Sequence, residues 1–364
     1  MDPRRFAAAV LIASSLAAPL HAQDDPPPTP EQFAERAAAS ERAPLFQSEE
    51  PLRVTLRTDI DYLRRERNDS VEVEGTVTFV DLDGSEVTRP VDVRARGEFR
   101  RDRSNCNFPP LRLDFPRGEM EGTVFEDQNR LKLVTPCQDN RDDYQRYVFD
   151  EYLAYKVFNV LTPASFRVRL LEITYEDVNG AYEPRTKMAF VIESDEAMAE
   201  RNRSVFLEVP QMHPVMADAD QAMLTGMFNY MIANLDWSAV FFHNVVVIRT
   251  EEGRHLTVPY DFDFSGLVNA RYATVPPQLA EQVRRVRQRL YRDFCRPQLE
   301  HAAMSAIFNA KRDAIGELYR TFPHYQNPDQ AEDALDFLEE FWEVIDDPRN
   351  FQRRIVADCL EMPR

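Results

Sequence analysis

Apolar and polar residues alternate in short runs through the first part of the chain. Between residues 51 and 115 the alternation has the two-residue period of half-buried strands, interrupted by a turn at Gly84. A further strand-like run covers residues 129–135, and residues 166–194 form two runs separated by Asn179-Gly180, a turn-forming pair. The pattern predicts an antiparallel meander followed by one more strand and a hairpin.

A helical period replaces this alternation in other parts of the chain. Residues 147–160 place their apolar side chains on one face, which predicts a single long helix within the β-rich part. A methionine stripe over residues 220–233 predicts a second helix, whose stripe belongs to the core. Helices are also expected over 277–295, 333–347 and 351–361. The second half is therefore expected to be mainly helical.

The N-terminal segment differs in composition from everything that follows. Residues 1–22 carry arginines, an alanine-rich apolar run and a small-residue end at Ala22, which are the features of a cleaved secretory signal peptide. Residues 23–50 are rich in proline and then in Ala, Glu and Arg, and are interpreted as a flexible linker with at most a loose helical turn. The rest divides into a β-rich lobe, 51–195, and a helical lobe, 196–364.

Charge and hydropathy narrow the possible partners. The chain has 44 basic and 62 acidic residues and a formal net charge of -18, which argues against a protein that wraps nucleic acid or depends on an anionic membrane surface. No later stretch approaches the ~20 apolar residues that a transmembrane helix needs. A periplasmic or secreted protein is expected. Arginines concentrated in residues 284–296 either meet an acidic or phosphorylated substrate or form a solvated helix face.

Four cysteines lie far apart, without the close pairs that a zinc site would show. In an oxidising compartment the most economical pairing joins Cys106 to Cys137 and Cys295 to Cys359, one bridge in each half of the chain. Four buried free thiols are the alternative.

The stretch VPYDFDFSG, residues 258–266, places Asp261 and Asp263 inside an apolar, aromatic run. It follows a loop with Asp236, then Asn244, then a predicted hairpin with its turn at Glu252-Gly253. Phosphoryl transfer needs a carboxylate that orients or deprotonates the acceptor, and Asn and Asp side chains that hold magnesium against nucleotide phosphates. A hairpin between these ligands would bring both its ends to one ion.

These residues resemble a known family, the CotH-type (spore coat) atypical kinases, over roughly residues 92–270. The matching segments are VRARGEF, LRLDF, NRLKLVT, the 147–160 helix, AFVIES, NLDWSAVFFHN and PYDFDFSG. The resemblance implies an α+β bilobal kinase-like fold, with an antiparallel β-rich N-lobe carrying one long helix and a mainly α-helical C-lobe. Asn244 lies eight residues beyond Asp236, a longer interval than in protein kinases, and no glycine-rich phosphate loop is present.

The resemblance also implies roles for individual residues. Asp236 would be the catalytic aspartate, and Asn244 and Asp261 would be metal ligands. Lys132 would contact phosphate, and Glu193 would lie near the nucleotide base.

Two further residues are assigned from the sequence pattern. Asp263 is grouped with the metal ligands, although alternation along a strand would turn one of the two aspartates away from the cleft. Glu151 on the long helix is the best candidate for an ion pair with Lys132 in the cofactor site.

Each assignment has a plainer alternative. Asp236 could cap a turn, and Lys132 could be a strand residue that faces solvent. Glu151 could be an exposed helical glutamate. His243 could bind a metal, or be a buried, hydrogen-bonded side chain.

Three functions fit this reading of the sequence. The first is an exported kinase-like transferase that uses Mg²⁺ or Mn²⁺ and ATP or another nucleotide to phosphorylate a protein or a small molecule. The second is a catalytically inactive pseudokinase-like binding protein. The third is a metal-dependent hydrolase built from Asp236, Asp261, Asp263 and His243.

Overall fold

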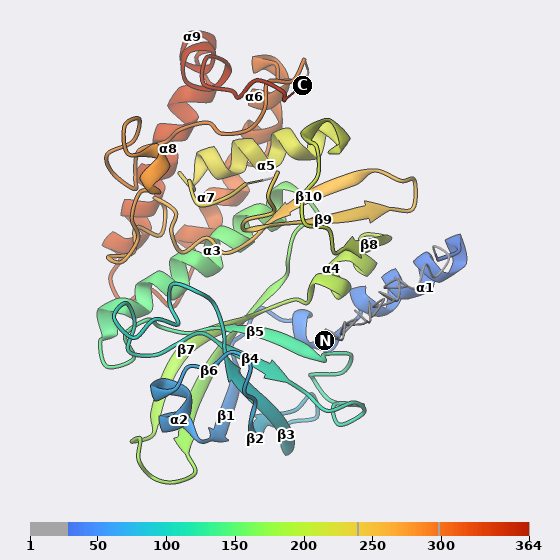
Figure 1. Ribbon diagram of the computed structural model, residues 1–364, viewed down its shortest axis with the longest axis vertical. Helices are drawn as coiled ribbons and strands as arrows, with labels where there is room; N and C mark the ends of the chain where they lie inside the picture. The colour runs from blue at the N-terminus through green and yellow to red at the C-terminus, as the bar shows by residue number, and fades with distance from the viewer. Residues whose placement is uncertain (1–27, 239, 298, 364) are drawn as a thin grey trace, which may run out of the picture.

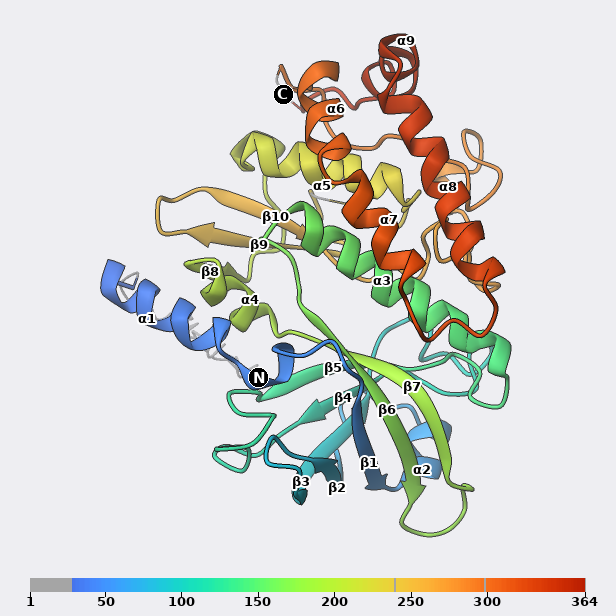
Figure 2. The same ribbon diagram turned by 180° about the vertical axis from the view of Figure 1, so that it is seen from behind.

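A computed structural model describes residues 28–238, 240–297 and 299–363 (Figure 1). A β-barrel occupies one end of the long axis, and the C-terminal helices occupy the other. Helix α3 (Gln145–Leu161) runs between them and contacts β6, β7 and α7, as the view from behind shows (Figure 2). The predicted signal peptide, residues 1–22, lies outside the described residues.

Seven strands of the first half close into a barrel in the order β1–β2–β3–β4–β5–β7–β6. All neighbours are antiparallel except β1 and β6, which pair in parallel from Leu52↔Leu171 to Thr58↔Asp177. The strands are β1 (Leu52–Thr58), β2 (Val73–Val80), β3 (Glu86–Ala95), β4 (Leu111–Asp114), β5 (Arg130–Val134), β6 (Val168–Asp177) and β7 (Arg185–Ile192), and the short helix α2 (Ile60–Arg65) follows β1.

Alternation along these strands separates the barrel interior from its outer face. Val54 and Leu56 of β1, like Leu111 and Leu113 of β4, are buried in one apolar cluster. The polar residues between them point outward, as a two-residue period requires. The predicted meander, single strand and hairpin are all present.

The second half contains a second sheet as well as helices. Strands β8 (Ser204–Leu207), β9 (Val245–Thr250) and β10 (His255–Pro259) form it in the order β10–β9–β8. Met223, Met227 and Met231 are buried in the core cluster that joins α3 to the C-terminal helices, as predicted. The helices are α4 (Asp195–Arg201), α5 (Ala219–Met231), α6 (His301–Asn309), α7 (Arg312–Arg320), α8 (Asp329–Ile345) and α9 (Pro348–Phe351), with a π-helical turn at Gln352–Val356 and short 3₁₀ turns at Pro44–Phe46, Asp142–Tyr144, Pro214–Met216 and Pro277–Leu279.

The prediction of a bilobal kinase-like fold with a helical C-lobe is wrong. The strands of the first half close into a barrel, and a three-stranded sheet lies in the part that was expected to be mainly helical. The alternation of residues locates strands, but it does not say which distant strands pair. The parallel pairing of β1 with β6, more than a hundred residues later in the chain, has no local signature.

The predicted helix over residues 277–295 is also absent. Only the 3₁₀ turn Pro277–Leu279 forms there, and the rest of the segment is irregular. Arg289 and Arg292 donate hydrogen bonds to the backbone carbonyls of Met231 and Trp237, and the Arg289 guanidinium lies 3.9 Å from the Phe337 ring centroid. These arginines hold the irregular segment against the helices, so they are not a solvated helix face.

Part of the predicted linker is folded onto the body of the protein. Residues Pro30–Glu41 form helix α1, whose N-terminus is closed by a capping box between Thr29 and Gln32. Arg167 donates a 2.6 Å hydrogen bond to the Ser40 carbonyl, and Arg169 one of 2.9 Å to the Leu45 carbonyl. Proline and alanine content alone did not show that two arginines more than a hundred residues away would bind this segment.

Both favoured disulfides are present, Cys106–Cys137 and Cys295–Cys359, and no cysteine is free. Two disulfides fit a protein of an extracellular or periplasmic compartment. No helix within the described ranges is long and apolar enough to cross a membrane.

Candidate functional site

The hairpin β9–β10 brings its two ends together, as the sequence predicted. Val245 pairs with Pro259, and the Tyr260 backbone N–H donates a 3.0 Å hydrogen bond to the Asn244 carbonyl. Asn244 and Asp261 therefore flank the same end of the hairpin. Both have left-handed backbones, with φ of 53° and 62°, a conformation that Asn and Asp adopt more readily than other non-glycine residues.

Asp236 is hydrogen-bonded to both residues that precede the hairpin. The Asn244 side-chain amide donates to the Asp236 carbonyl at 2.8 Å and to its carboxylate at 3.2 Å, and His243 Nε2 lies 2.9 Å from Asp236 Oδ1. Ser238 and His243 exchange two backbone hydrogen bonds. This small turn takes up the long interval between Asp236 and Asn244. The Asn244 amide nitrogen is committed to Asp236, which leaves the amide oxygen as the atom able to ligate a cation.

His243 is half exposed, so the alternative of a buried histidine is not what the structure shows. Its hydrogen bond to the Asp236 carboxylate raises the pKa of the His243 imidazole above its ordinary value. The His243 ring is hydrogen-bonded to Asp236 and not to Asp261. His243 therefore orients the candidate catalytic carboxylate.

Two buried carboxylates lie behind Asp261. Asp263 and Glu151 are 4% and 1% exposed, and one guanidinium nitrogen of Arg100 lies 3.9 Å from each. Burial raises the pKa of Asp263 to about 7, Asp261 adds to the rise, and Arg100 opposes it. Burial, followed by Asp263 and Asp261, also raises the pKa of Glu151.

Within the part of the chain that the structure describes, Arg100 is thus the one ion-pair partner of both buried carboxylates, and a single guanidinium balances only one of their two negative charges. Glu151 Oε1 is buried and has no hydrogen-bond partner among the described residues. A buried carboxylate oxygen without a partner destabilises the fold unless a cation or a proton satisfies it. Asp263 is one of the two carboxylates of this cluster, and the charge of Asp261 adds to the raised pKa values of both.

Helix α3 supplies the back wall of the site. Glu151 and Tyr155 lie four residues apart on one face of the helix. The Tyr155 hydroxyl accepts a 2.8 Å hydrogen bond from the Asp261 backbone N–H, and the Tyr155 ring packs on Phe262 at 4.6 Å. Glu151 is therefore neither an exposed helical residue nor the ion-pair partner of Lys132.

A row of cations lines the outer face of the barrel beside this cluster. Arg94, Arg112 and Lys132 are directly opposite one another on β3, β4 and β5, and so point to the same face. Adjacent like charges destabilise a sheet, and Asp114 partly offsets them by contacting Arg94, Arg112 and Arg130. We call Arg94, Arg112, Arg130 and Lys132 the cation row.

Lys132 connects the cation row to the hairpin. Its ammonium lies 4.7 Å from the centroid of the Tyr260 ring, next to Asp261, and its ion-pair partner is Asp195 at 3.1 Å. The sequence did signal the row, because VRAR and LRLDF carry arginines at outward positions of successive strands. Only the strand register shows that those positions are neighbours.

Glu193 has no free carboxylate oxygen to offer a nucleotide. It is fully buried, and both oxygens are bound, one 2.7 Å from Arg167 and the other 3.0 Å from Arg201. It also accepts a hydrogen bond from the Arg167 backbone N–H. Glu193 therefore ties the end of β7 to the start of β6 and to α4, apart from the carboxylate cluster.

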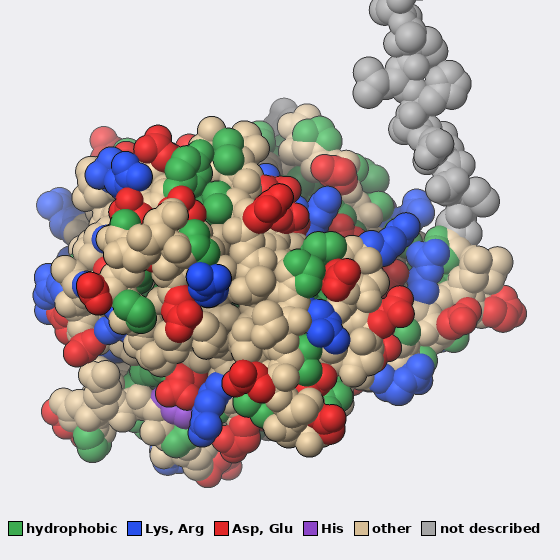
Figure 3. Space-filling model, turned by 90° about the horizontal axis from the view of Figure 1, so that it is seen from below, with side chains coloured by type: hydrophobic (Ala, Val, Ile, Leu, Met, Phe, Trp, Pro, Cys, Tyr) green, Lys and Arg blue, Asp and Glu red, His purple; other side chains and the backbone are tan. Residues whose placement is uncertain are grey.

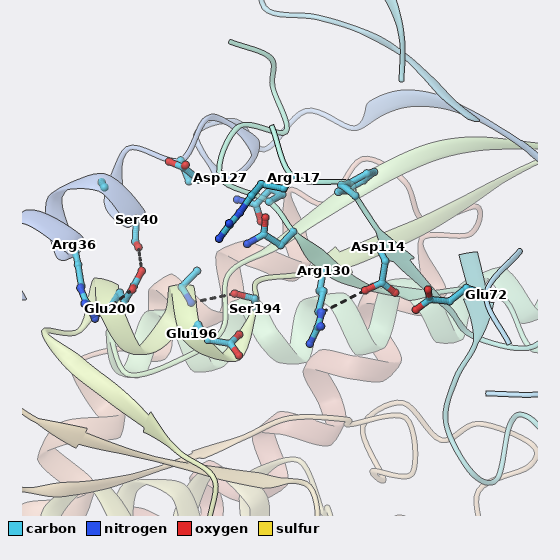
Figure 4. A pocket seen from close by; sticks show the side chains of 16 residues that line it. Arg36, Ser40, Glu72, Asp114, Arg117, Asp127, Arg130, Ser194, Glu196 and Glu200 are labelled. Atoms are coloured by element: carbon cyan, nitrogen blue, oxygen red, sulfur yellow. Dashed lines mark hydrogen bonds and ion pairs between the residues drawn. The ribbon is translucent and has the colours of Figure 1, made fainter. Parts of the chain in front are cut away.

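A pocket of about 760 Å³ adjoins the cation row (Figure 4). Helix α1, the connection between β4 and β5, and helix α4 line it. Figure 4 shows Arg130 against Asp114 on one side and Glu196 and Glu200 of α4 on the other. The carboxylate cluster is not part of its lining, so this hollow lies beside the candidate chemistry and does not contain it.

Within the described part of the chain, no three His, Cys, Asp or Glu side chains are arranged to hold a metal ion by themselves. Asp261, Asp263 and the Asn244 amide offer oxygen ligands only, which suits a hard cation such as Mg²⁺. Mg²⁺ usually keeps several waters and takes phosphate oxygens as further ligands, so an incomplete protein set fits it. Glu151 Oε1 has no hydrogen-bond partner among the described residues, and a bound cation would provide one.

Comparisons of the chain with protein-family models, with curated proteins and with solved structures find no match.

Proposed function

We propose that this site is a metal-dependent phosphotransferase, which moves a phosphoryl group from ATP or another nucleotide to a protein or small-molecule acceptor. One observation carries the proposal: a buried carboxylate cluster with an unpartnered Glu151 oxygen lies close to a row of four cations, and Lys132 of that row contacts Tyr260 next to the cluster. A metal-bound polyphosphate carries charges of both signs. Its cation would bind to the carboxylates, and its negative phosphate oxygens would bind to the cation row.

Asp261, Asp263 and the Asn244 amide oxygen would hold Mg²⁺ or Mn²⁺. The bound cation would neutralise charge on the transferred phosphoryl group. The left-handed backbones of Asn244 and Asp261 keep both side chains at the end of the hairpin. Tyr155 fixes the Asp261 backbone from α3.

Asp236 would orient or deprotonate the acceptor hydroxyl. His243 and the Asn244 amide hold its carboxylate in place, so little reorganisation is needed when an acceptor arrives. Arg112 and Lys132 would bind phosphate oxygens from the outer face of the barrel wall, in exchange for their ion pairs with Asp114 and Asp195.

The first prediction separates cation binding from turnover. In calorimetric titrations with Mn²⁺ and then with ATP, Asp261→Asn should weaken cation binding at least tenfold, because it removes a charged ligand. Asp236→Asn should bind Mn²⁺ and ATP normally, yet lose transfer of radioactive phosphate from [γ-³²P]ATP to a mixture of casein and small hydroxyl compounds, or to the protein itself.

Asp336→Asn is the matched control, because it makes the same exchange at an exposed position on α8. It should leave cation binding, ATP binding and transfer unchanged. Equal Mn²⁺ affinity in the Asp261 and Asp336 variants would rule out the assigned ligands. ATP binding without any transfer in the wild type would instead favour the binding protein without turnover.

A hydrolase is the second candidate, because His243 and Asp236 form a half-exposed hydrogen-bonded pair that could activate water. His243→Ala distinguishes the two. A hydrolase with His243 as its base would lose nearly all turnover in this variant, whereas a transferase in which His243 only positions the Asp236 carboxylate would be slowed and stay active.

Membership of the CotH-type kinases stays a prediction, and the phosphotransferase proposal does not depend on it. The proposal includes export by the N-terminal signal peptide, with cleavage after Ala22. The two disulfides support an oxidising compartment. N-terminal sequencing of the protein secreted from an expression host tests the cleavage position.

A further inference from the structure

A second basic site lies at the end of helix α2, and it shares no residue with the cation row. Arg64, Arg65, Arg67 and Arg103 line a cavity of about 270 Å³ together with Asn107. Acidic and basic side chains are interspersed over the barrel end of the molecule (Figure 3). A cavity lined by four arginines and no carboxylate departs from that mixture in a chain with a net charge of -18.

The arginines of this cavity are poorly compensated by acidic residues. Arg67 is buried and donates its hydrogen bonds to the backbone carbonyls of Arg64, Arg101 and Cys106. Arg103 contacts the Arg65 carbonyl at 3.5 Å. Among the described residues of the cavity wall, the only ion pair is that of Arg65 with Asp61, at 2.7 Å.

Arg64 carries a polar atom that the protein leaves unsatisfied. Its guanidinium lies 4.8 Å from the Tyr182 ring centroid, and its Nε is buried without a hydrogen-bond partner among the described residues. Burial, together with the charges of Arg103 and Arg64, lowers the pKa of the Arg67 guanidinium to about 10, although the charge of Asp102 opposes the fall. The cavity therefore brings several like charges close together.

Structural roles explain only part of this cluster. Arg64 and Arg65 end α2, where cations interact favourably with the helix dipole, and Arg67 pins the loop that the Cys106–Cys137 disulfide anchors. Neither role requires Arg103 to lie beside Arg67, where it opposes the charge of that residue. Neither role satisfies Arg64 Nε. An anion in the cavity would account for the position of Arg103 beside Arg67.

We propose that this arginine cavity binds one tetrahedral oxyanion group, phosphate or sulfate, either as the free ion or as a monoester. Guanidinium groups bind such groups through paired N–H donors, and several of them converge here. The cavity has room for one such group. The site is independent of the phosphotransferase proposal, because none of its residues belongs to the carboxylate cluster or the cation row.

Titration of the full-length protein with inorganic phosphate tests the proposal. EDTA is present, so that no divalent cation can recruit phosphate to the carboxylate cluster, and binding is followed by calorimetry and by ³¹P line broadening. Arg103→Ala should weaken phosphate binding at least tenfold, because an exposed guanidinium that contributes charge to the cavity is lost. The phosphate affinity of Arg103→Lys should lie between those of the wild type and Arg103→Ala, because lysine keeps the positive charge but lacks the paired N–H donors of arginine.

Arg53→Ala is the matched control, an exposed arginine on β1 whose loss changes the net charge equally. It should bind phosphate like the wild type, and circular dichroism should show all variants folded. The proposal is overturned if the wild type gives neither heat nor broadening, or if the Arg103 and Arg53 variants bind equally. Parallel titrations with sulfate and methyl phosphate separate the sources: binding of methyl phosphate supports a monoester ligand, and binding of the inorganic ions alone supports a free anion.

Discussion

Asp293 shows at the scale of one residue what burial does to a carboxylate. It is 1% exposed, its only ion-pair partner among the described residues is Arg296 at 3.7 Å, and its Oδ2 lacks a hydrogen bond. Burial raises the pKa of Asp293 from 3.8 to about 6, although Arg296 opposes the rise. The folded protein therefore binds this proton more tightly than the unfolded chain does.

This shift predicts a pH dependence of stability. Because the folded-state pKa is raised, the contribution of Asp293 to stability falls as the pH rises from about 4 to about 6, by about 3 kcal/mol in total. Asp293→Asn cannot ionise and should lack this decline. Urea unfolding of both proteins between pH 4 and 7 measures the difference, and a difference that does not change with pH would contradict the assignment.

Single residues of the candidate site were only partly predictable. The order of Asp236, Asn244 and Asp261 around a hairpin was enough to place them together, because a hairpin joins its own ends. Glu151 was not placed correctly, since its helix is apolar on more than one side and the sequence does not show which neighbour covers each side. Arg100 was missed altogether, because it lies in a loop without periodicity.

At the scale of elements, α5 packs so closely that one of its positions has no room for a methyl group. A Cβ added to Gly226 would lie 2.6 Å from the Cβ of Asp293. In α7, a Cβ added to Gly316 would meet only the flexible end of Arg320, at 2.7 Å. The same substitution should therefore have opposite effects in the two helices.

Gly226→Ala should destabilise the protein, since an overpacking cost of about 1–3 kcal/mol exceeds the ~1 kcal/mol gained in helix propensity. Gly316→Ala should leave stability unchanged or raise it by up to about 1 kcal/mol, because Arg320 can move aside. Thermal unfolding of the two variants measures both effects. Equal destabilisation would show that the α5 contact is not the cause.

Elements with a strong period were predicted well, and the irregular segment was not. The hairpin of β9 and β10 and helices α3, α5 and α8 follow from their patterns. The stretch 277–295 has helix-forming residues as well, yet it folds without a helix. Its arginines instead contact backbone carbonyls of Met231 and Trp237 and the ring of Phe337. Tertiary contacts outweighed local propensity there.

At the scale of the whole molecule, the two disulfides close loops of different length. Cys295–Cys359 spans 64 residues and Cys106–Cys137 spans 31. Replacing both cysteines of the longer bridge by serine should cost about 4 kcal/mol of stability, and the shorter bridge slightly less, because the longer loop restricts the unfolded chain more. Urea unfolding of the two double variants measures the order, and a larger loss from the shorter bridge would mean that local native contacts dominate.

The parallel pairing of β1 with β6 also affects how the chain folds while it is being synthesised. The ribosome synthesises β1 more than a hundred residues before β6. One edge of β1 therefore stays unpaired until β6 is made. Such an edge invites pairing with another chain, and a holding chaperone would suppress it. Because β1 waits for β6 before the barrel can close, we expect this protein to fold slowly and to depend on a chaperone while it folds.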